Sequence, residues 1–174
     1  MGCRAATLVT GAGSSMALYH DIPRTILRDM RRDDLPAVLD IERRSFAQPW
    51  SRAFFEKELA TAFARLVVAE EDAPAGQWVV GYTCRWRVTD EVHLLNVAVH
   101  PERRGLGHGR LLVAAVVDES RRAAARAVFL EVRAGNVVAR RLYRQLGFKD
   151  LGVRRGYYGP GQDAIVMELR LDGR

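Results

Sequence analysis

Residues 104–109 form a glycine-rich turn between an apolar stretch and a long amphipathic stretch. The turn consists of Arg104, Gly105, Leu106, Gly107, His108 and Gly109, and Arg110 follows it. A turn that opens a helix directly after a strand exposes backbone N–H groups at the positive end of that helix. The turn lacks the Lys-Ser/Thr pair of a P-loop, and it begins with arginine rather than the glycine of the dinucleotide fingerprint. The spacing therefore predicts a phosphate-binding cradle and leaves the ligand open.

Two further residues have the chemistry to move protons. Glu131 lies inside a short apolar strand pattern, where an acidic residue is disfavoured. A partly buried carboxylate there can act as a general base, although the side chain could instead face solvent or pair with Arg133. Tyr143 lies on an amphipathic helix pattern, where its ring can pack while its hydroxyl reaches a cleft. An ordinary interfacial tyrosine is the alternative, and Asn136 by itself indicates only a helix N-cap.

The overall composition indicates one folded domain after a short tail. The chain has 174 residues, of which 48% are hydrophobic and 28% charged, and its net charge is +6. We expect residues 1–23 to form a flexible tail and residues 24–174 a single domain. The positive charge suits an anionic ligand or an acidic partner, nucleic acid included, and an arginine-rich solvated surface would explain it equally well.

Cysteine and histidine usage argues against two classes of site. The two cysteines have no metal-ligand spacing, and the four histidines are scattered. This pattern predicts neither a disulfide framework nor a metal site. No apolar run approaches the length of a membrane span, and the first residues lack a secretion signal. We therefore expect a cytoplasmic protein that does not associate with a membrane.

Hydrophobic periodicity predicts the elements that must position these residues. Strands are expected over 25–30, 66–69, 78–86, 93–100, 128–132, 152–158 and 164–171. Helices are expected over 35–46, over 52–59, from the glycine turn to about 125, and over 137–146. The last helix is expected to bury Val138, Leu142 and Leu146. The order predicts an α+β (mixed α/β) fold with a central mixed sheet of about seven strands flanked by about four helices.

The ordered set of motifs resembles the GNAT acetyltransferase superfamily. The motifs are Val97-Ala-Val99, Pro101, Arg104-x-x-Gly-x-Gly109, Leu130-Glu-Val-Arg133 with Asn136, and Leu142-Tyr-x-x-x-Gly-Phe148. Within the superfamily, four features resemble the ribosomal-protein alanine N-acetyltransferase (RimI-type) family. They are Ser45-Phe-x-x-Pro-Trp-Ser51, the Leu-Glu-Val-Arg strand, Arg154-Arg-Gly-Tyr-Tyr158 and Asp163-Ala-Ile-Val-Met167. The resemblance covers residues 24–171 and implies a GNAT-type fold.

The resemblance also implies roles for individual residues. Val97, Ala98 and Val99 would pair with the acetyl-pantetheine arm of acetyl-CoA. The turn from Arg104 to Arg110 would wrap the pyrophosphate, and Asn136 would contact the pantetheine region. Glu131 would be the general base, working through water, and Tyr143 the general acid that protonates the CoA thiolate. The slot for a peptide N-terminus would be bordered by Pro49, Trp50, Tyr157 and Tyr158.

The implied function is acetyl-CoA-dependent acetylation of a protein N-terminal α-amine. By resemblance, the acceptor is the alanine that starts the eighteenth small-subunit ribosomal protein. An α-amine of pKa about 7.7–8.0 is neutral about a tenth of the time at pH 7, and a lysine well under ~0.1% of the time. We expect direct attack by a monomeric enzyme without a metal, and the function requires no direct contact with nucleic acid.

Three alternatives remain at this point. A GNAT enzyme could act on protein lysine side chains or on a small-molecule amine. A non-catalytic CoA-sensing or ribosome-binding module could keep the same fold. A nucleic-acid binder is suggested by charge alone, without the interleaved basic and aromatic strand residues of the recognised modules.

Overall fold

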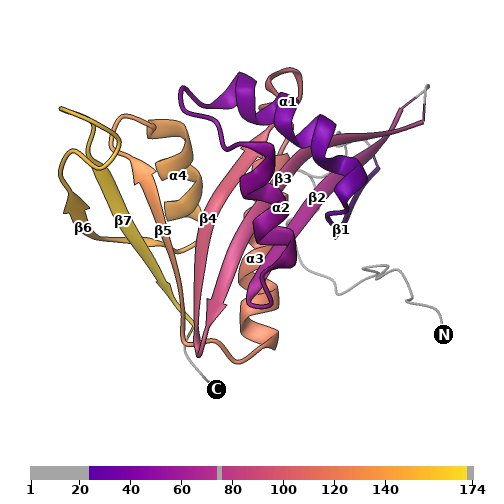
Figure 1. Ribbon diagram of the computed structural model, residues 1–174. Helices are drawn as coiled ribbons and strands as arrows, with labels where there is room; N and C mark the ends of the chain where they lie inside the picture. Colours follow the sequence, from indigo (N-terminus) through magenta and orange to yellow (C-terminus); the bar gives the residue numbers. More distant parts are fainter. Residues whose placement is uncertain (1–23, 74–75, 172–174) are drawn as a thin grey trace.

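A seven-stranded mixed sheet forms the centre of the computed structural model, which describes residues 24–73 and 76–171 (Figure 1). The strands are β1 (Thr25–Asp29), β2 (Ala64–Ala73), β3 (Gly76–Val88), β4 (Glu91–Val99), β5 (Ala127–Arg133), β6 (Lys149–Arg154) and β7 (Ala164–Arg170). Their order across the sheet is β1-β2-β3-β4-β5-β7-β6. Only β4 and β5 pair in parallel among these described strands, so the class is the predicted mixed α+β fold.

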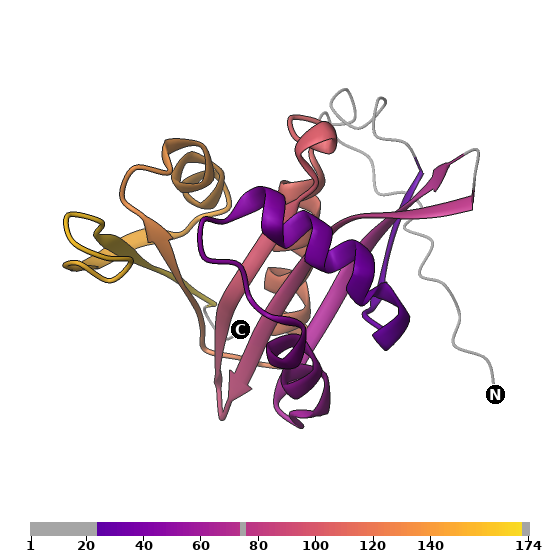
Figure 2. The same ribbon diagram turned by 45° about the horizontal axis from the view of Figure 1, so that its top comes forward.

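Four α-helices cover the two faces of this sheet (Figure 2). They are α1 (Leu35–Ser45), α2 (Arg52–Ala60), α3 (His108–Arg122) and α4 (Val137–Gln145), with short 3₁₀ turns η2 (Arg32–Asp34) and η3 (Pro101–Arg103). Leu35, Val38 and Phe55 bury α1 and α2 against one face. Val113 of α3 and Tyr143 of α4 join a core on the other face.

Side-chain caps explain where two of these helices begin. The Ser51 hydroxyl accepts a hydrogen bond from the Phe54 N–H at 3.2 Å, and Asn136 Oδ1 accepts one from the Ala139 N–H at 3.1 Å. Asp34 does not cap α1 in this way, because its carboxylate is held by the Arg28 guanidinium and by the Arg31 N–H. Asp34 therefore stabilises η2, which precedes α1.

β4 and β5 separate beyond Leu94. Their pairing runs from Glu91 opposite Ala127 to Leu94 opposite Leu130, and then stops within the described chain. The register between β3 and β4 also shifts at this level of the sheet. From Asn96 to Val99, β4 remains paired with β3 while β5 diverges from it (Figure 1). This divergence leaves the β5-facing backbone edge of Val97–Val99 open to a ligand.

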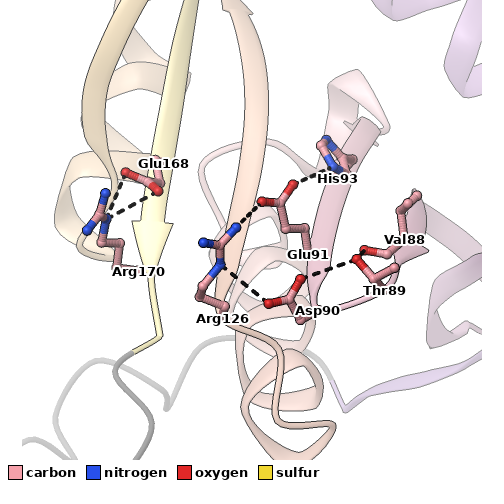
Figure 3. A network of polar contacts seen from close by, with 8 residues as sticks. All are labelled: Val88, Thr89, Asp90, Glu91, His93, Arg126, Glu168 and Arg170. Carbon is pink, nitrogen blue, oxygen red and sulfur yellow. Dashed lines mark hydrogen bonds and ion pairs between the residues drawn. The ribbon is translucent and has the colours of Figure 1, made fainter.

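A polar network holds the closed end of the β4–β5 pair (Figure 3). The Arg126 side chain contacts the carboxylates of Glu91 at 2.5 Å and Asp90 at 3.4 Å. The Arg126 N–H also donates to the Asp90 carbonyl at 2.6 Å, and its carbonyl accepts from the Leu171 N–H at 2.8 Å. These contacts hold β4, β5 and the end of β7 together. The two strands β4 and β5 are therefore fixed at this end and diverge toward the other.

Two details of the expected elements are wrong. The sixth strand spans Lys149–Arg154 rather than 152–158, because Gly156 adopts φ +62° and turns the chain before Tyr157 and Tyr158. In α4, Val138 is 82% exposed, and Tyr143 is buried instead. This short helix packs through Ala139, Tyr143 and Leu146, which recur at helical spacing on one side. The expected tail, residues 1–23, lies outside the described residues.

Candidate active site

A groove of about 690 Å³ runs between the glycine turn and α4, beside the free edge of Val97–Val99. Four of the residues that line it are arginines: Arg103, Arg104, Arg110 and Arg141. No carboxylate is found among the described residues of this lining. The groove is therefore strongly electropositive, which fits a ligand that carries several phosphate charges.

The glycine turn has the backbone geometry of an anion cradle. Gly105 and Gly107 adopt φ values of +80° and +93°, which residues with a side chain rarely adopt. Gly107 is the N-cap of α3 and supplies no side-chain hydrogen bond to the first helical N–H groups. Those donors and the positive end of the helix macrodipole are thus available to phosphate oxygens.

The side chains of the turn point in different directions. Arg104 donates to the Val99 carbonyl at 3.1 Å and to the Ser45 hydroxyl at 2.9 Å, which ties the turn to β4 and α1. Arg110 donates to the Gln145 side chain of α4 at 2.9 Å. Leu106 is exposed and is not part of the groove lining.

His108 turns its imidazole into the protein interior. Its Nε2 lies 2.7 Å from Oε1 of Glu71, and both side chains are almost fully buried. The Arg103 guanidinium contacts the same glutamate at 3.2 Å. Burial lowers the pKa of His108 and outweighs the opposing effect of Glu71. A neutral imidazole therefore anchors the start of α3, and only the backbone of His108 remains for a ligand in the groove.

Glu131 and Tyr143 both line a central cavity of about 390 Å³. Glu131 lies on the side of the sheet covered by α1 and α2, whereas Tyr143 lies on α4 on the opposite side. The cavity exists because β4 and β5 diverge. Asn136 lines both this cavity and the arginine-lined groove. Burial, with a smaller contribution from Tyr158, raises the pKa of Tyr143, so its phenol stays protonated at neutral pH.

The Glu131 carboxylate is half-buried and forms an ion pair with Arg154. The Arg154 guanidinium also stacks on the Tyr157 ring at 4.3 Å. A hydrogen bond to Glu131 is the main cause that raises the pKa of Tyr157. Arg133 instead stacks on Tyr158 at 4.2 Å and bonds to Gln162. Two arginine–tyrosine stacks therefore lie beside Glu131, and both tyrosines come from the segment between β6 and β7.

An aromatic pocket of about 780 Å³ adjoins the central cavity. Trp50 and Tyr158 line both spaces, and Tyr157 lines the pocket. Other ring side chains in its wall are Phe54, Trp86, His93 and Phe129. Pro49 is exposed and lines neither these two spaces nor the arginine-lined groove. Neighbouring spaces share lining residues, so the three spaces adjoin one another along a path from the glycine turn to the aromatic pocket.

Glu42 is a residue of this site that the sequence reasoning missed. Its side chain on α1 is 1% exposed and lines the central cavity. The carboxylate accepts hydrogen bonds from the Trp50 N–H at 2.9 Å, the Asn96 amide at 3.3 Å and the Tyr82 hydroxyl. Burial raises its pKa. An acidic residue seven positions after Leu35, on the apolar stripe of the helix, was the signal that could have identified it.

Two searches of the described residues bear on other kinds of site. Nowhere in residues 24–73 and 76–171 do three or more His, Cys, Asp or Glu side chains gather so as to hold a metal ion. Over the same residues, no helix has the length and apolar character needed to cross a membrane.

Comparison with known proteins agrees with this geometry. Residues 35–148 match the acetyltransferase (GNAT) family. A ribosomal protein bS18-alanine N-acetyltransferase from Salmonella typhimurium is 37% identical over 139 residues, covering 78% of this chain and 90% of the relative. The crystal structure of the ribosomal-protein-S18-alanine N-acetyltransferase from Escherichia coli superposes with a TM-score of 0.78 at 30% identity, covering 86% of this chain and 96% of that one.

A third comparison concerns the cofactor acetyl-CoA. A Salmonella typhimurium chain solved with its cofactor acetyl-CoA superposes with a TM-score of 0.69 at 25% identity, covering 87% of this chain and 96% of that one. The family match over residues 35–148 spans more than half of the sequence and includes the glycine turn, Glu131 and Tyr143. This chain therefore belongs to the GNAT acetyltransferase family, whose members take the acetyl group from acetyl-CoA.

Proposed function

We propose that this chain acetylates the N-terminal α-amine of a protein, and that its principal acceptor is the N-terminal alanine of ribosomal protein bS18. Relatives that cover most of the chain carry this activity in their names. The observation that carries the proposal is the path described above, in which Glu131 and Tyr143 meet between the arginine-lined groove and the aromatic pocket. Such a path can bring a donor and an acceptor together from opposite ends.

The donor end of the path suits acetyl-CoA. The N–H groups at the start of α3 and the groove arginines would hold its phosphates. The edge of Val97–Val99 that does not pair with β5, where Arg104 bonds to the Val99 carbonyl, would hold its pantetheine arm. Asn136 lies where groove and cavity meet and would contact the same arm. Acetyl-CoA, when bound, supplies the acetyl group as an activated thioester.

Glu131 and Tyr143 would handle the protons. An acceptor ammonium must lose a proton before its nitrogen can attack, and Glu131 would receive that proton directly or through a water molecule. Tyr143 would donate its phenolic proton to the departing sulfur. As the tetrahedral adduct collapses, the nitrogen loses a second proton, which passes through water to the Tyr143 phenolate. The Glu131 carboxyl then ends protonated, and loss of its proton to solvent restores it. No nucleophilic side chain of the enzyme is required, so the amine attacks directly.

The acceptor end is shaped for a peptide that enters with its N-terminus first. Trp50 and Tyr158 border the central cavity, and Tyr157 borders the pocket beyond it. An α-amine suits one carboxylate of modest strength, because its pKa of about 7.7–8.0 leaves a useful neutral fraction at pH 7. A lysine amine has a pKa near 10.4 and would require far stronger proton abstraction.

A steady-state assay with three acceptors tests the proposal. An alanine-initiated bS18 peptide should be acetylated with the highest kcat/KM, and mass spectrometry should place the acetyl group on the α-nitrogen. The same peptide with a blocked N-terminus and an internal lysine should react little, as should an aminoglycoside. Failure to turn over the alanine peptide would refute the proposal and favour a lysine or small-molecule acceptor.

A further inference from the structure

Arg154 reaches Glu131 across an intervening strand. Glu131 of β5 and Gly152 of β6 both pair with Val166 of β7, so they flank the same residue of the central strand. Arg154 lies two positions after Gly152 and therefore projects from the same face of the sheet. Its guanidinium spans β7 and ends at the Glu131 carboxylate. Gly152 has no side chain and its face is open, which leaves this route free.

Several other polar groups lie around Glu131 on the neighbouring elements. Tyr157 and Tyr158 come from the segment between β6 and β7, His93 from β4, Arg133 from β5, Tyr143 from α4 and Glu42 from α1. Arg133 is engaged by Gln162 and Tyr158. Among the described residues, Arg154 is the one cation that forms an ion pair with Glu131.

The guanidinium is held at this position rather than free to swing away. It stacks on the Tyr157 ring at 4.3 Å and pairs with the Glu131 carboxylate at the same time. An arginine suits this place because its planar group can stack and pair at the same time, which a lysine ammonium does less well. The stack therefore keeps a positive charge at the mouth of the acceptor site.

That charge has a consequence for any amine that approaches Glu131. An ammonium would enter next to a guanidinium, and a like charge a few ångströms away disfavours the charged form. The neutral amine, which alone has the lone pair needed for attack, meets no such penalty. The proton released when the N–H bond of the ammonium breaks passes to Glu131 or to a water molecule, as in the mechanism above.

We propose that Arg154 is a positioning residue of the acceptor site, which orients the Glu131 carboxylate and favours the acceptor as a neutral amine rather than an ammonium. This inference rests on the proposed function, because it takes Glu131 as the group that the acceptor amine meets. On this inference Arg154, the last residue of β6, helps to set the pH range of the reaction.

The test is the pH dependence of the single-turnover rate with saturating acetyl-CoA and alanine peptide. We expect the acidic limb of the profile to move upward by about one pH unit in R154Q and in R154M, which remove the charge. R154K should keep the limb in place, because it keeps the charge, while its rate falls. R155Q is the matched control, since Arg155 is the exposed neighbour, and it should retain the wild-type profile.

Two readouts keep the inference separate from a loss of folding and from the proposed function. The affinity for acetyl-CoA and the thermal unfolding of R154Q should match wild type, because Arg154 is 54% exposed on an edge strand. A rate that falls by the same factor at every pH would show that Arg154 only anchors its loop and would overturn the inference. If wild type left the alanine peptide unmodified, the proposed function would fail, and the profiles would then be compared with whichever amine it does acetylate.

Discussion

Glu131 and Tyr143 approach one cavity from opposite faces of the same sheet. Glu131 projects from β5 toward the side of α1 and α2, and Tyr143 projects from α4 on the other side. An intact sheet would keep them apart. The divergence of β4 and β5 beyond Leu94 removes that barrier, and the proposed base and acid require this arrangement to act on one reacting centre from two sides.

Conservative changes at these two residues should affect turnover and leave donor binding intact. E131Q removes the proton acceptor and Y143F removes the proton donor, and neither changes side-chain size much. We expect each to lower kcat by about 10²- to 10⁴-fold. Acetyl-CoA affinity, measured by calorimetry, should stay at the wild-type value. E168Q is the control on β7, because Glu168 pairs with Arg170 and lines none of the three spaces, and its kcat should be unchanged. Wild-type turnover by both site variants would show that the two residues are not catalytic.

The glycine turn can be tested with a pair of alanine variants. Gly107 has φ +93°, so G107A forces a side chain into the left-handed region at a cost of about 1–2 kcal/mol. We expect weaker acetyl-CoA binding and a lower free energy of unfolding. G76A is the control, because Gly76 also has a positive φ of +115° but lies outside the groove lining. Wild-type donor affinity in G107A would exclude the turn as the phosphate cradle.

Glu42 should be essential for holding the acceptor side of the cavity. E42A strands the Trp50 N–H, the Tyr82 hydroxyl and the Asn96 amide, and should lower the free energy of unfolding by about 1–3 kcal/mol or more. E42Q keeps an acceptor and should lose less. Urea unfolding measures both, with E56Q on the exposed face of α2 as control. A fully stable E42A protein would contradict this role.

The pH dependence of stability gives a separate test of Glu42. Its pKa is raised in the folded protein, so its contribution is fully present below the ordinary glutamate pKa and is lost as pH rises through the raised value. Gln cannot titrate. The stability of wild type relative to E42Q should therefore decrease as pH increases from about 4 toward neutrality. A constant difference over that range would mean that burial does not shift this carboxyl.

His108 should produce the opposite dependence. Burial lowers its pKa, so its contribution is present above the ordinary histidine pKa of about 6.5 and is lost as pH falls. Wild type should lose stability relative to H108Q as the pH falls from 7.5 to 5. H93Q, which removes an exposed imidazole of β4, serves as the control. A wild-type profile parallel to that of H108Q would show that folding does not lower the pKa of His108.

The sequence allowed the order of strands and helices to be predicted, because most elements have a clear apolar period and strong caps such as Ser51 and Asn136. It did not allow the buried face of α4 to be predicted. Val137 and Val138 suggested an apolar stripe, but the first turn of this helix projects beyond the core, so both are exposed. Tyr143 is instead the residue of this helix that packs into the core.

The sequence predicted which residues belong to the candidate site better than it predicted how those residues contact one another. Motif resemblance identified Glu131 and Tyr143, but their convergence depends on strand divergence, which is a property of the folded sheet. The pairing of Glu131 with Arg154 was not predicted, because the two residues meet across β7. Glu42 was missed because its three partners come from separate parts of the chain.

The most direct measurement of the central claim is the mass of the bS18 N-terminus in cells that lack this gene. The account predicts an unmodified N-terminal alanine in those cells. A plasmid with the wild-type gene should restore the acetyl group, and a plasmid with E131Q should not, although its protein accumulates to the same level. An N-terminus that remains acetylated without the gene, or that wild type fails to restore, would contradict the account.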